Sequence, residues 1–336
     1  MTAEGNPSPS VEEIARALAG APVLGLKQVG GGRNSRVFRL DSEAGVYALK
    51  QYPARQDDPR DRLGTEAAAL RWMEERDLTM VPRLIATDRD NNFALLSWAD
   101  GVLVREVGES DIDQAAEFLG KLHALRATPA IPVSHLATEA CLSGAEIERQ
   151  INARVAHLRA LKDEPALHAF LSTRFVPSFS RFLAKAHETF TAAGTPFDGE
   201  LEQSRRSLVP SDFGFHNALR AEDGRLTFID FEYFGWDDPV KLTADIILHP
   251  GTPVAPALRE RFRGAAERLY GEDPEFGLRL RAFFPLFGLR WVLILLNEFH
   301  PERWRRRVLA GETLSWTQAK ERQLHVASAM LAQLAD

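Results

Sequence analysis

Cysteine is nearly absent from the 336-residue sequence, which holds only Cys141. A single thiol excludes an intramolecular disulfide, and it excludes the paired cysteines of redox and structural zinc motifs. Charge of one sign is not in large excess either, since 41 Lys and Arg residues stand against 47 Asp and Glu residues. Affinity for nucleic-acid phosphates comes from clustered basic side chains, so we expect no nucleic-acid partner. The lone thiol favours a reducing, cytoplasmic location.

Long apolar runs are scarce as well. The longest, near residues 291–296, falls far below the about 20 residues that a membrane-spanning helix needs. Residues 1–10 are polar and lack the basic start and apolar stretch of a secretory signal. We therefore expect a soluble protein without a membrane partner, with enough chain for one large or two modest domains.

The hydrophobic pattern begins with a short helix and a run of strands. Ser10 precedes Val11 and two acidic residues, as at a helix N-cap, and predicts a helix that ends by Gly20. The part that follows alternates between short β-type runs and turns rich in Gly, Asn and Asp. Strands are predicted at residues 37–40, 46–50, 83–86 and 93–96, and one helix at residues 60–76.

Helical patterns dominate after Gly101. They cover residues 113–125 and 143–193. One β-like island interrupts them at residues 207–231, where a short apolar run follows a turn. The sequence thus predicts an α+β protein, with a β-rich N-terminal part that contains one main helix and a larger helical C-terminal part.

The β-like island holds the most specific pattern. It reads Ser-Asp-Phe-Gly-Phe-His-Asn over residues 211–217, and Phe-Ile-Asp-Phe-Glu over residues 228–232. Asp212 and Asn217 have the Asp-x-x-x-x-Asn spacing of a kinase catalytic loop, in which the Asp accepts the hydroxyl proton and the Asn supports a metal. Asp230 follows one hairpin later, at the end of an apolar strand, where a carboxylate suits Mg²⁺. Two unrelated turn aspartates would rarely share this joint spacing.

Two weaker motifs precede the island. Residues 30–37 form a glycine-rich turn that can bend closely over phosphate oxygens, although an ordinary hairpin turn looks the same. Lys50 ends a predicted strand and Glu66 lies on the next helix, where an ion pair can fix the lysine against nucleotide phosphates. A surface lysine after a strand is the competing interpretation. Together the motifs supply a phosphate cover, a cation, metal ligands and a base, which phosphoryl transfer needs.

With these residues, the sequence resembles the aminoglycoside phosphotransferase and choline kinase superfamily, relatives of the protein kinases. The resemblance covers most of the chain, and residues 116–123 resemble the family's Leu-x-x-Leu-His helix. It implies a protein-kinase-like two-lobe fold, with a nucleotide-binding lobe over residues 1–98 and a catalytic, acceptor-binding lobe over residues 99–336. It also implies ATP (or GTP) and Mg²⁺ as cofactors, and a small-molecule hydroxyl acceptor.

The resemblance also assigns roles to single residues. Asp212 and Asn217 correspond to the catalytic loop, and Asn217 and Asp230 to the metal ligands. The other matched positions would bind the nucleotide through the phosphate loop, the lysine–glutamate ion pair and the backbone of an inter-lobe hinge at residues 93–101. These positions are Gly31, Gly32, Asn34, Ser35, Lys50, Glu66, Ser97 and Ala99.

The catalytic loop departs from the family at two positions. Pro210 stands where the family usually has His, and Ser211 where it usually has Gly. That His is mainly a structural support in the family, so its loss bears on loop geometry more than on the identity of the base. His216 lies inside the loop, and because Asp212 already fills the role of base, we expect a positioning or structural part for His216.

Four other polar residues are weaker candidates. His249 and His300 each precede a proline without companions at metal-ligand spacing, so we expect helix-end histidines and no zinc site. Asp245 fits a later acidic position of the family loosely, and a structural role at a helix end is expected. Arg290 lies on a late helix of the kind that helps form the family's acceptor pocket. If Arg290 lines that pocket, it favours an acceptor with a carboxylate or phosphate.

The leading hypothesis is a phosphotransferase that acts on a hydroxyl of a sugar or other polyhydroxyl compound. Two alternatives stay open: a catalytically silent nucleotide-binding scaffold, for which Pro210 leaves room, and an aminoglycoside-modifying kinase. A protein kinase is disfavoured, because residues 230–238 leave no space for a long activation segment. One fold hosts many acceptors, so the acceptor, the preference for ATP or GTP and the oligomeric state stay open.

Overall fold

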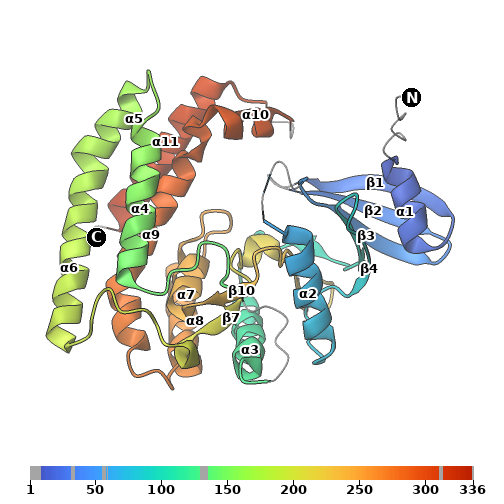
Figure 1. The fold of residues 1–336 in the computed structure, drawn as a ribbon, viewed down its shortest axis with the longest axis horizontal. Coiled ribbons are helices and arrows are strands. Elements are labelled where there is room, and N and C mark those ends of the chain that lie inside the picture. Colours follow the sequence, from blue (N-terminus) through green and yellow to red (C-terminus); the bar gives the residue numbers. More distant parts are fainter. Residues whose placement is uncertain are drawn as a thin grey trace, which may run out of the picture. The chain divides into compact units, whose positions relative to one another are not determined.

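The chain forms two compact units in the computed structural model, which describes residues 9–31, 35–54, 58, 60–128, 135–309 and 313–334. Unit 1 comprises Met1–Val102, Ala130–Val133 and Ala218–Phe234, and unit 2 comprises Leu103–Pro129, Ser134–Asn217 and Gly235–Asp336. Unit 1 is rich in strands and unit 2 is mostly helical (Figure 1), which confirms the predicted α+β class.

An antiparallel sheet of five strands forms the centre of unit 1 (Figure 1). Its order is β1-β2-β3-β5-β4, and neighbouring strands pair antiparallel throughout. The strands are β1 (Val23–Gly31), β2 (Arg36–Ser42), β3 (Gly45–Gln51), β4 (Leu84–Asp88) and β5 (Phe93–Ser97). Each predicted strand overlaps one of them, because Gly, Asn and Asp mark the turns between the apolar runs.

Two helices accompany this sheet. Helix α1 (Val11–Ala19) begins at a capping box formed by Ser10 and ends at the left-handed Gly20, as predicted. It packs against β1, β4 and β5 and buries Ile14 in a small apolar core. Helix α2 (Arg62–Glu74) packs against β4 and β5.

A hairpin from late in the sequence completes unit 1. Its sheet has the order β6-β8-β9, with β6 (Val102–Leu103), β8 (Ala218–Arg220) and β9 (Leu226–Phe228). The N–H of Phe228 donates to the carbonyl of Met80 at 2.8 Å, which fastens β9 to the N-terminal part of the chain. The predicted lobe boundary after residue 98 therefore differs from the two units, because residues 218–234 pack within unit 1.

Unit 2 is built around an apolar core enclosed mainly by helices α4, α6, α9 and α11. Its strands β7 (Ser207–Val209) and β10 (Gly235–Asp237) pair antiparallel. The helices are α3 (Glu109–Leu125), α4 (Gly144–Arg159), α5 (Pro165–Phe170), α6 (Val176–Ala193), α7 (Pro239–Leu248), α8 (Pro256–Leu269), α9 (Phe276–Leu295), α10 (Pro301–Leu309) and α11 (Trp316–Gln333). Short helical turns add η1 (Leu171–Phe175), η2 (Gln203–Arg205), η3 (Phe215–Asn217) and η4 (Leu296–Phe299).

The apolar character of α9 was underestimated from the sequence. Among the described residues, Phe276–Phe299 is the one segment whose length and composition would allow it to cross a membrane. Arginines at intervals hide this segment in a search for uninterrupted apolar runs. In unit 2, however, 61% of its most apolar stretch is buried among other helices, as in the core helix of a globular protein.

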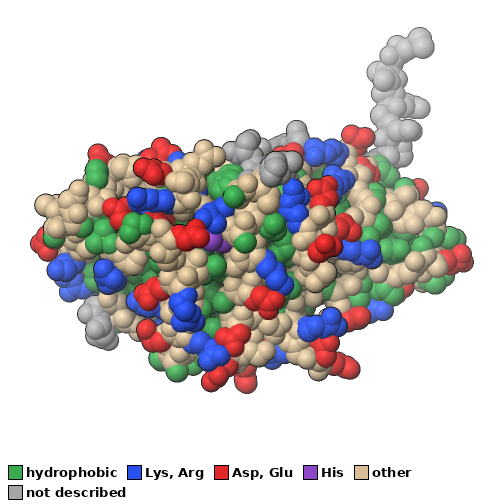
Figure 2. All heavy atoms as spheres, turned by 90° about the horizontal axis from the view of Figure 1, so that it is seen from below, with side chains coloured by type: hydrophobic (Ala, Val, Ile, Leu, Met, Phe, Trp, Pro, Cys, Tyr) green, Lys and Arg blue, Asp and Glu red, His purple; other side chains and the backbone are tan. Residues whose placement is uncertain are grey.

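The surface charge is mixed on the face drawn in Figure 2. Basic and acidic side chains alternate there without one large patch of a single sign. This distribution agrees with the near balance of charges in the sequence, which has a formal net charge of -6.

Candidate active site

Lys50 lies at the centre of a buried ionic cluster in unit 1. Strand β3 carries the lysine, α2 carries Glu66, and the turn after β9 carries Asp230. Lys50 Nζ donates to Glu66 Oε2 and to Asp230 Oδ1, each at 2.6 Å. The predicted ion pair of Lys50 with Glu66 is thus confirmed. The competing interpretation of Lys50 as an ordinary surface lysine is wrong, because Lys50 is only 5% exposed.

Glu66 is held in place by two further donors. The hydroxyl of Tyr52 donates to Glu66 Oε2 at 2.6 Å, and the N–H of Phe231 donates to Glu66 Oε1 at 3.1 Å. The second bond joins α2 to the residue that follows Asp230. The helix, strand β3 and the β9 turn are therefore fixed around one carboxylate, which leaves Lys50 little freedom.

A second set of charged groups surrounds the cluster and was not predicted. Arg62 donates to Glu232 at 2.5 Å and to the hydroxyl of Tyr233 at 2.6 Å, and it also pairs with Asp58. Arg62 lies one helical turn before Glu66, so both side chains are on one face of α2. This spacing is the signal in the sequence that points to a second charged residue beside the site.

The cluster carries more negative than positive charge near Lys50. Carboxylate oxygens of Glu66, Asp230 and Glu232 lie within 4.8 Å of one another. Partial burial raises the pKa of Asp230 to about 7, with Lys50 acting against this shift and the two neighbouring carboxylates adding to it. Glu232 Oε2 is buried, accepts no hydrogen bond, and lies 3.5 Å from Lys50 Nζ. Such a set of oxygen donors fits Mg²⁺, because a divalent cation would balance the excess charge.

The predicted catalytic loop lies in unit 2, after β7. Ser211 adopts a left-handed backbone with φ 68°, and its hydroxyl donates to the carbonyl of Thr138 at 3.0 Å. The amide nitrogen of Asn217 donates to the backbone carbonyl of Asp212 at 3.0 Å, which closes the loop. The carbonyl oxygen of the Asn217 amide, the atom that would bind a cation, is not used in this bond.

Two stacked histidines flank Asp212. His216 Nε2 lies 3.2 Å from Asp212 Oδ1, and its ring stacks on that of His249, with centroids 3.7 Å apart. The ring of His249 in turn meets Trp291 edge-on at 4.6 Å. His249 caps α7, which confirms its helix-end position. From the sequence we expected no other potential metal ligands near His249. This expectation is wrong for the folded chain, because ligand atoms of Asp212, His216 and His249 lie within 4.8 Å of one another.

This arrangement sets the charge state of Asp212. Partial burial raises the pKa of its carboxyl, but the hydrogen bond from His216 and the charges of His216, His249 and Lys241 outweigh burial and lower it. Asp212 is therefore ionised at neutral pH. An ionised carboxylate can accept the hydrogen bond of a substrate hydroxyl and orient its oxygen for attack.

The other predicted nucleotide contacts lie on the sheet of unit 1 or outside the described residues. Gly31 ends β1 and Ser35 comes directly before β2, while Gly32 and Asn34 are not among the described residues. Ser97 ends β5, and its N–H already donates to the carbonyl of Arg83 at 2.9 Å. Ala99 follows two residues later. Nucleotide binding by these positions stays a prediction.

Arg290 is buried and lines neither of the two described pockets, so the condition considered from the sequence is not met. It is 4% exposed, lies 3.5 Å from Asp245, and contacts the side chain of Gln150 at 3.4 Å. Asp245, in the last turn of α7, also pairs with Lys241 and accepts a hydrogen bond from Trp291. These residues form a buried network inside unit 2, so Arg290 provides no argument about the acceptor.

Comparisons with known proteins agree with this arrangement. The sequence profile described as phosphotransferase enzyme family matches residues 25–284. Among the curated proteins, none matches this chain. Solved structures match over nearly the whole chain, at identities that show the fold alone.

Three solved structures illustrate the similarity. A choline/ethanolamine kinase family protein from Mesorhizobium loti is 16% identical, with 96% of this chain and 98% of that chain covered and a TM-score of 0.57. A thermostable mutant of aminoglycoside phosphotransferase APH(4)-Ia, in ternary complex with ADP and hygromycin B, is 18% identical, with 97% and 98% covered and a TM-score of 0.57. The gentamicin complex of APH(2″)-IIa is 15% identical, with 97% and 96% covered and a TM-score of 0.60.

The family match extends over most of the chain, and both units have the secondary structure that the resemblance implies. The chain belongs to the phosphotransferase enzyme family, and it is a small-molecule phosphotransferase with the protein-kinase-like fold.

Proposed function

We propose that this protein transfers the γ-phosphate of ATP (or GTP) to a hydroxyl of a small molecule, with a sugar or other polyhydroxyl compound as acceptor. The observation that carries the proposal is Lys50, buried and bonded at 2.6 Å to both Glu66 and Asp230. Burying a lysine among several carboxylates costs desolvation free energy, which a purely structural role explains poorly. The same arrangement suits the binding of phosphates and a metal. A cytoplasmic location, where nucleotides are plentiful, is part of the proposal.

Unit 1 would supply the nucleotide-binding groups. Burial lowers the pKa of Lys50, but the opposite charges of Asp230 and Glu66 outweigh it and raise that pKa well above its ordinary value, so the side chain is an ammonium at neutral pH. That ammonium would bind nucleotide phosphates, and Asp230 would hold Mg²⁺, with Asn217 as the second predicted ligand. When bound, the metal neutralises charge on the phosphate oxygens.

Unit 2 would supply the base. Asp212 would accept the hydrogen bond of the acceptor hydroxyl, and His216 would hold the carboxyl in one orientation at 3.2 Å. The attacking oxygen needs orientation more than a strong base in phosphoryl transfer, which agrees with the lowered pKa of Asp212.

The runner-up is a catalytically silent nucleotide-binding protein. Pro210 favours it, because a proline cannot offer the side-chain support that the family's His provides. An aminoglycoside acceptor is the other alternative, since two similar structures hold gentamicin and hygromycin B.

Acceptor-dependent ADP release separates these proposals. We would measure it in Mg²⁺ with sugars, sugar acids, amino alcohols and aminoglycosides, for wild type, Asp212→Ala and the exposed control Asp198→Ala. The proposal expects release with one acceptor class, lost at least about a hundredfold in Asp212→Ala and unchanged in the control. Nucleotide binding without turnover for every acceptor would favour the silent protein.

A further inference from the structure

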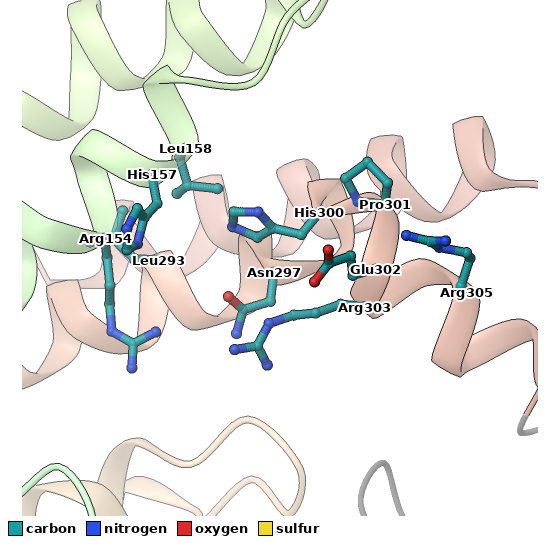
Figure 3. Close-up of a pocket in the computed structure, with 10 residues that line it drawn as sticks. All are labelled: Arg154, His157, Leu158, Leu293, Asn297, His300, Pro301, Glu302, Arg303 and Arg305. Carbon is teal, nitrogen blue, oxygen red and sulfur yellow. The ribbon is translucent and has the colours of Figure 1, made fainter. Parts of the chain in front are cut away.

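A basic groove of about 590 Å³ lies in unit 2, and neither the Lys50 cluster nor the catalytic loop lines it. Helix α4 contributes Arg154 and His157, η4 contributes Asn297, and the start of α10 contributes Arg303 and Arg305. Figure 3 shows the guanidinium groups of Arg154 and Arg303 pointing to the same side, with the amide of Asn297 between them in this view. The groove therefore presents several hydrogen-bond donors in one direction.

The charge of the groove is positive. Three arginines line it against the carboxylate of Glu302, and although Arg154 is paired with Glu139, Arg303 and Arg305 leave an excess of positive charge. His300 also lines the groove, and its pKa is lowered by burial first and then by the charges of Arg303, His157 and Arg154. An anion in the groove would be attracted, and a polycation would be repelled.

Contacts within unit 2 link the groove to the catalytic loop. Arg154 donates to the carboxylate of Glu139 at 2.5 Å. The preceding residue, Thr138, accepts the hydroxyl hydrogen bond of Ser211 at 3.0 Å, next to Asp212. One short segment thus contacts both the groove and the loop that carries the predicted base.

We propose that this groove binds an anionic group of the acceptor, so that the substrate is a polyhydroxyl compound that also carries a carboxylate or a phosphate. Guanidinium groups bind both anions in a bidentate manner, and an amide can add a hydrogen bond to a neighbouring hydroxyl. The inference rests on the proposed function, because it names the substrate class of the same reaction. It disfavours an aminoglycoside, whose ammonium groups would meet three arginines.

Calorimetric titration with three matched ligands tests the inference. D-Glucitol is uncharged, D-gluconate carries a carboxylate, and D-glucitol 6-phosphate carries a phosphate on a similar chain. The variants are Arg303→Gln and Arg305→Gln, which change exposed residues of the groove. The matched control is Arg322→Gln, an exposed arginine of α11 that does not line the groove.

We expect one or both anions to bind at least about tenfold more tightly than D-glucitol, and each groove variant to weaken anion binding about tenfold. The control should bind as wild type does. The anion that binds more tightly identifies the group, carboxylate or phosphate. Equal binding of D-glucitol and both anions, or unchanged anion binding in both groove variants, would overturn the inference.

Titration of wild type with ADP and Mg²⁺ keeps the two proposals apart. Normal ADP binding without any preference for the anions overturns the acceptor inference alone. Failure to bind ADP would reject the proposed function, and the acceptor inference with it.

Discussion

His216 holds the carboxyl of Asp212 from the C-terminal side of the catalytic loop. Its Nε2 lies 3.2 Å from Asp212 Oδ1, and its ring is fixed by the stack on His249. The family's usual support comes from the position of Pro210, which has no side-chain donor. We infer that His216, together with the Ser211 hydroxyl, replaces that support.

Replacing His216 by Phe keeps a ring for the stack on His249 and removes the donor to Asp212. We expect the kcat of ADP release to fall about ten- to a hundredfold, because the carboxyl loses its fixed orientation. The KM for nucleotide should stay the same, since the nucleotide groups assigned to unit 1 are untouched. The exposed His325→Phe serves as control. A loss confined to thermal stability, with kcat unchanged, would contradict the positioning role.

We expect His123 to make the stability of unit 2 depend on pH. Burial lowers the pKa of its imidazole to about 4 from the ordinary 6.5, and its Nδ1 lies 3.2 Å from the hydroxyl of Ser207. The unfolded chain therefore takes up the proton first as pH falls. The contribution of His123 is present above about pH 6.5 and is lost as pH falls towards about 4, by at most about 3 kcal/mol.

Urea unfolding of wild type and His123→Gln between pH 4 and 7.5 measures this contribution. The difference in unfolding free energy between the two proteins should shrink as pH falls, because only wild type loses the advantage of a neutral imidazole. A constant difference across this range would show that His123 does not titrate as inferred.

Strand β10 depends on the absence of a side chain at Gly235. A Cβ there would lie 2.4 Å from the backbone nitrogen of Ala137, and a backbone cannot yield as a flexible side chain can. Gly235 pairs with Val209, the last residue before the catalytic loop. Gly235→Ala should therefore lower the unfolding free energy by about 1–3 kcal/mol and also reduce turnover.

Gly264→Ala provides the matched comparison in thermal unfolding. Gly264 lies inside α8, where an added Cβ meets only the tip of Arg268 at 3.5 Å. This change should raise stability by up to about 1 kcal/mol, because alanine is the better helix former. Equal effects of the two substitutions would contradict the close approach at Gly235.

The longer elements could be predicted from the sequence, and the shortest could not. The capping box at Ser10 and the period of α2 are local signals, so both helices were found. Strands β7 and β10 have three residues each, too few for a pattern to repeat. A late helix was expected around Arg290, but the apolar length of α9 was missed because arginines interrupt the run, and Arg279 and Arg290 are nevertheless buried against carboxylates.

At the scale of the whole molecule, the sequence could predict site residues that belong to motifs. It could not predict contacts between positions that are far apart along the chain. Motif spacing identified Lys50, Glu66 and Asp230, and the structure brings these three together in unit 1. The bond from Arg62 to Glu232 joins residues 170 positions apart, and no local pattern specifies such a pair. The stack of His216 on His249 and the basic groove depend likewise on how distant helices pack.

Metal and nucleotide should stabilise the protein together. At a hundred times its dissociation constant, a ligand adds about 2.7 kcal/mol to the folded state, enough to raise the melting temperature by about 5 °C in a protein of this size. We expect this shift with ADP and Mg²⁺, and a clearly smaller one when EDTA removes the metal, because Lys50 and Arg62 cannot balance both the phosphates and the three carboxylates.

Asp230→Asn tests which residue links the metal to that stabilisation. The variant keeps the shape of the side chain but loses the charge that would bind Mg²⁺, so its melting temperature with ADP should no longer depend on EDTA. The control Asp90→Asn changes an exposed aspartate of unit 1 and should behave as wild type does. If Asp230→Asn keeps the full metal-dependent shift, Mg²⁺ is held by other groups. If wild type shows no shift with ADP at all, ADP does not bind, the proposed function is rejected, and the buried lysine cluster is a structural device of the fold.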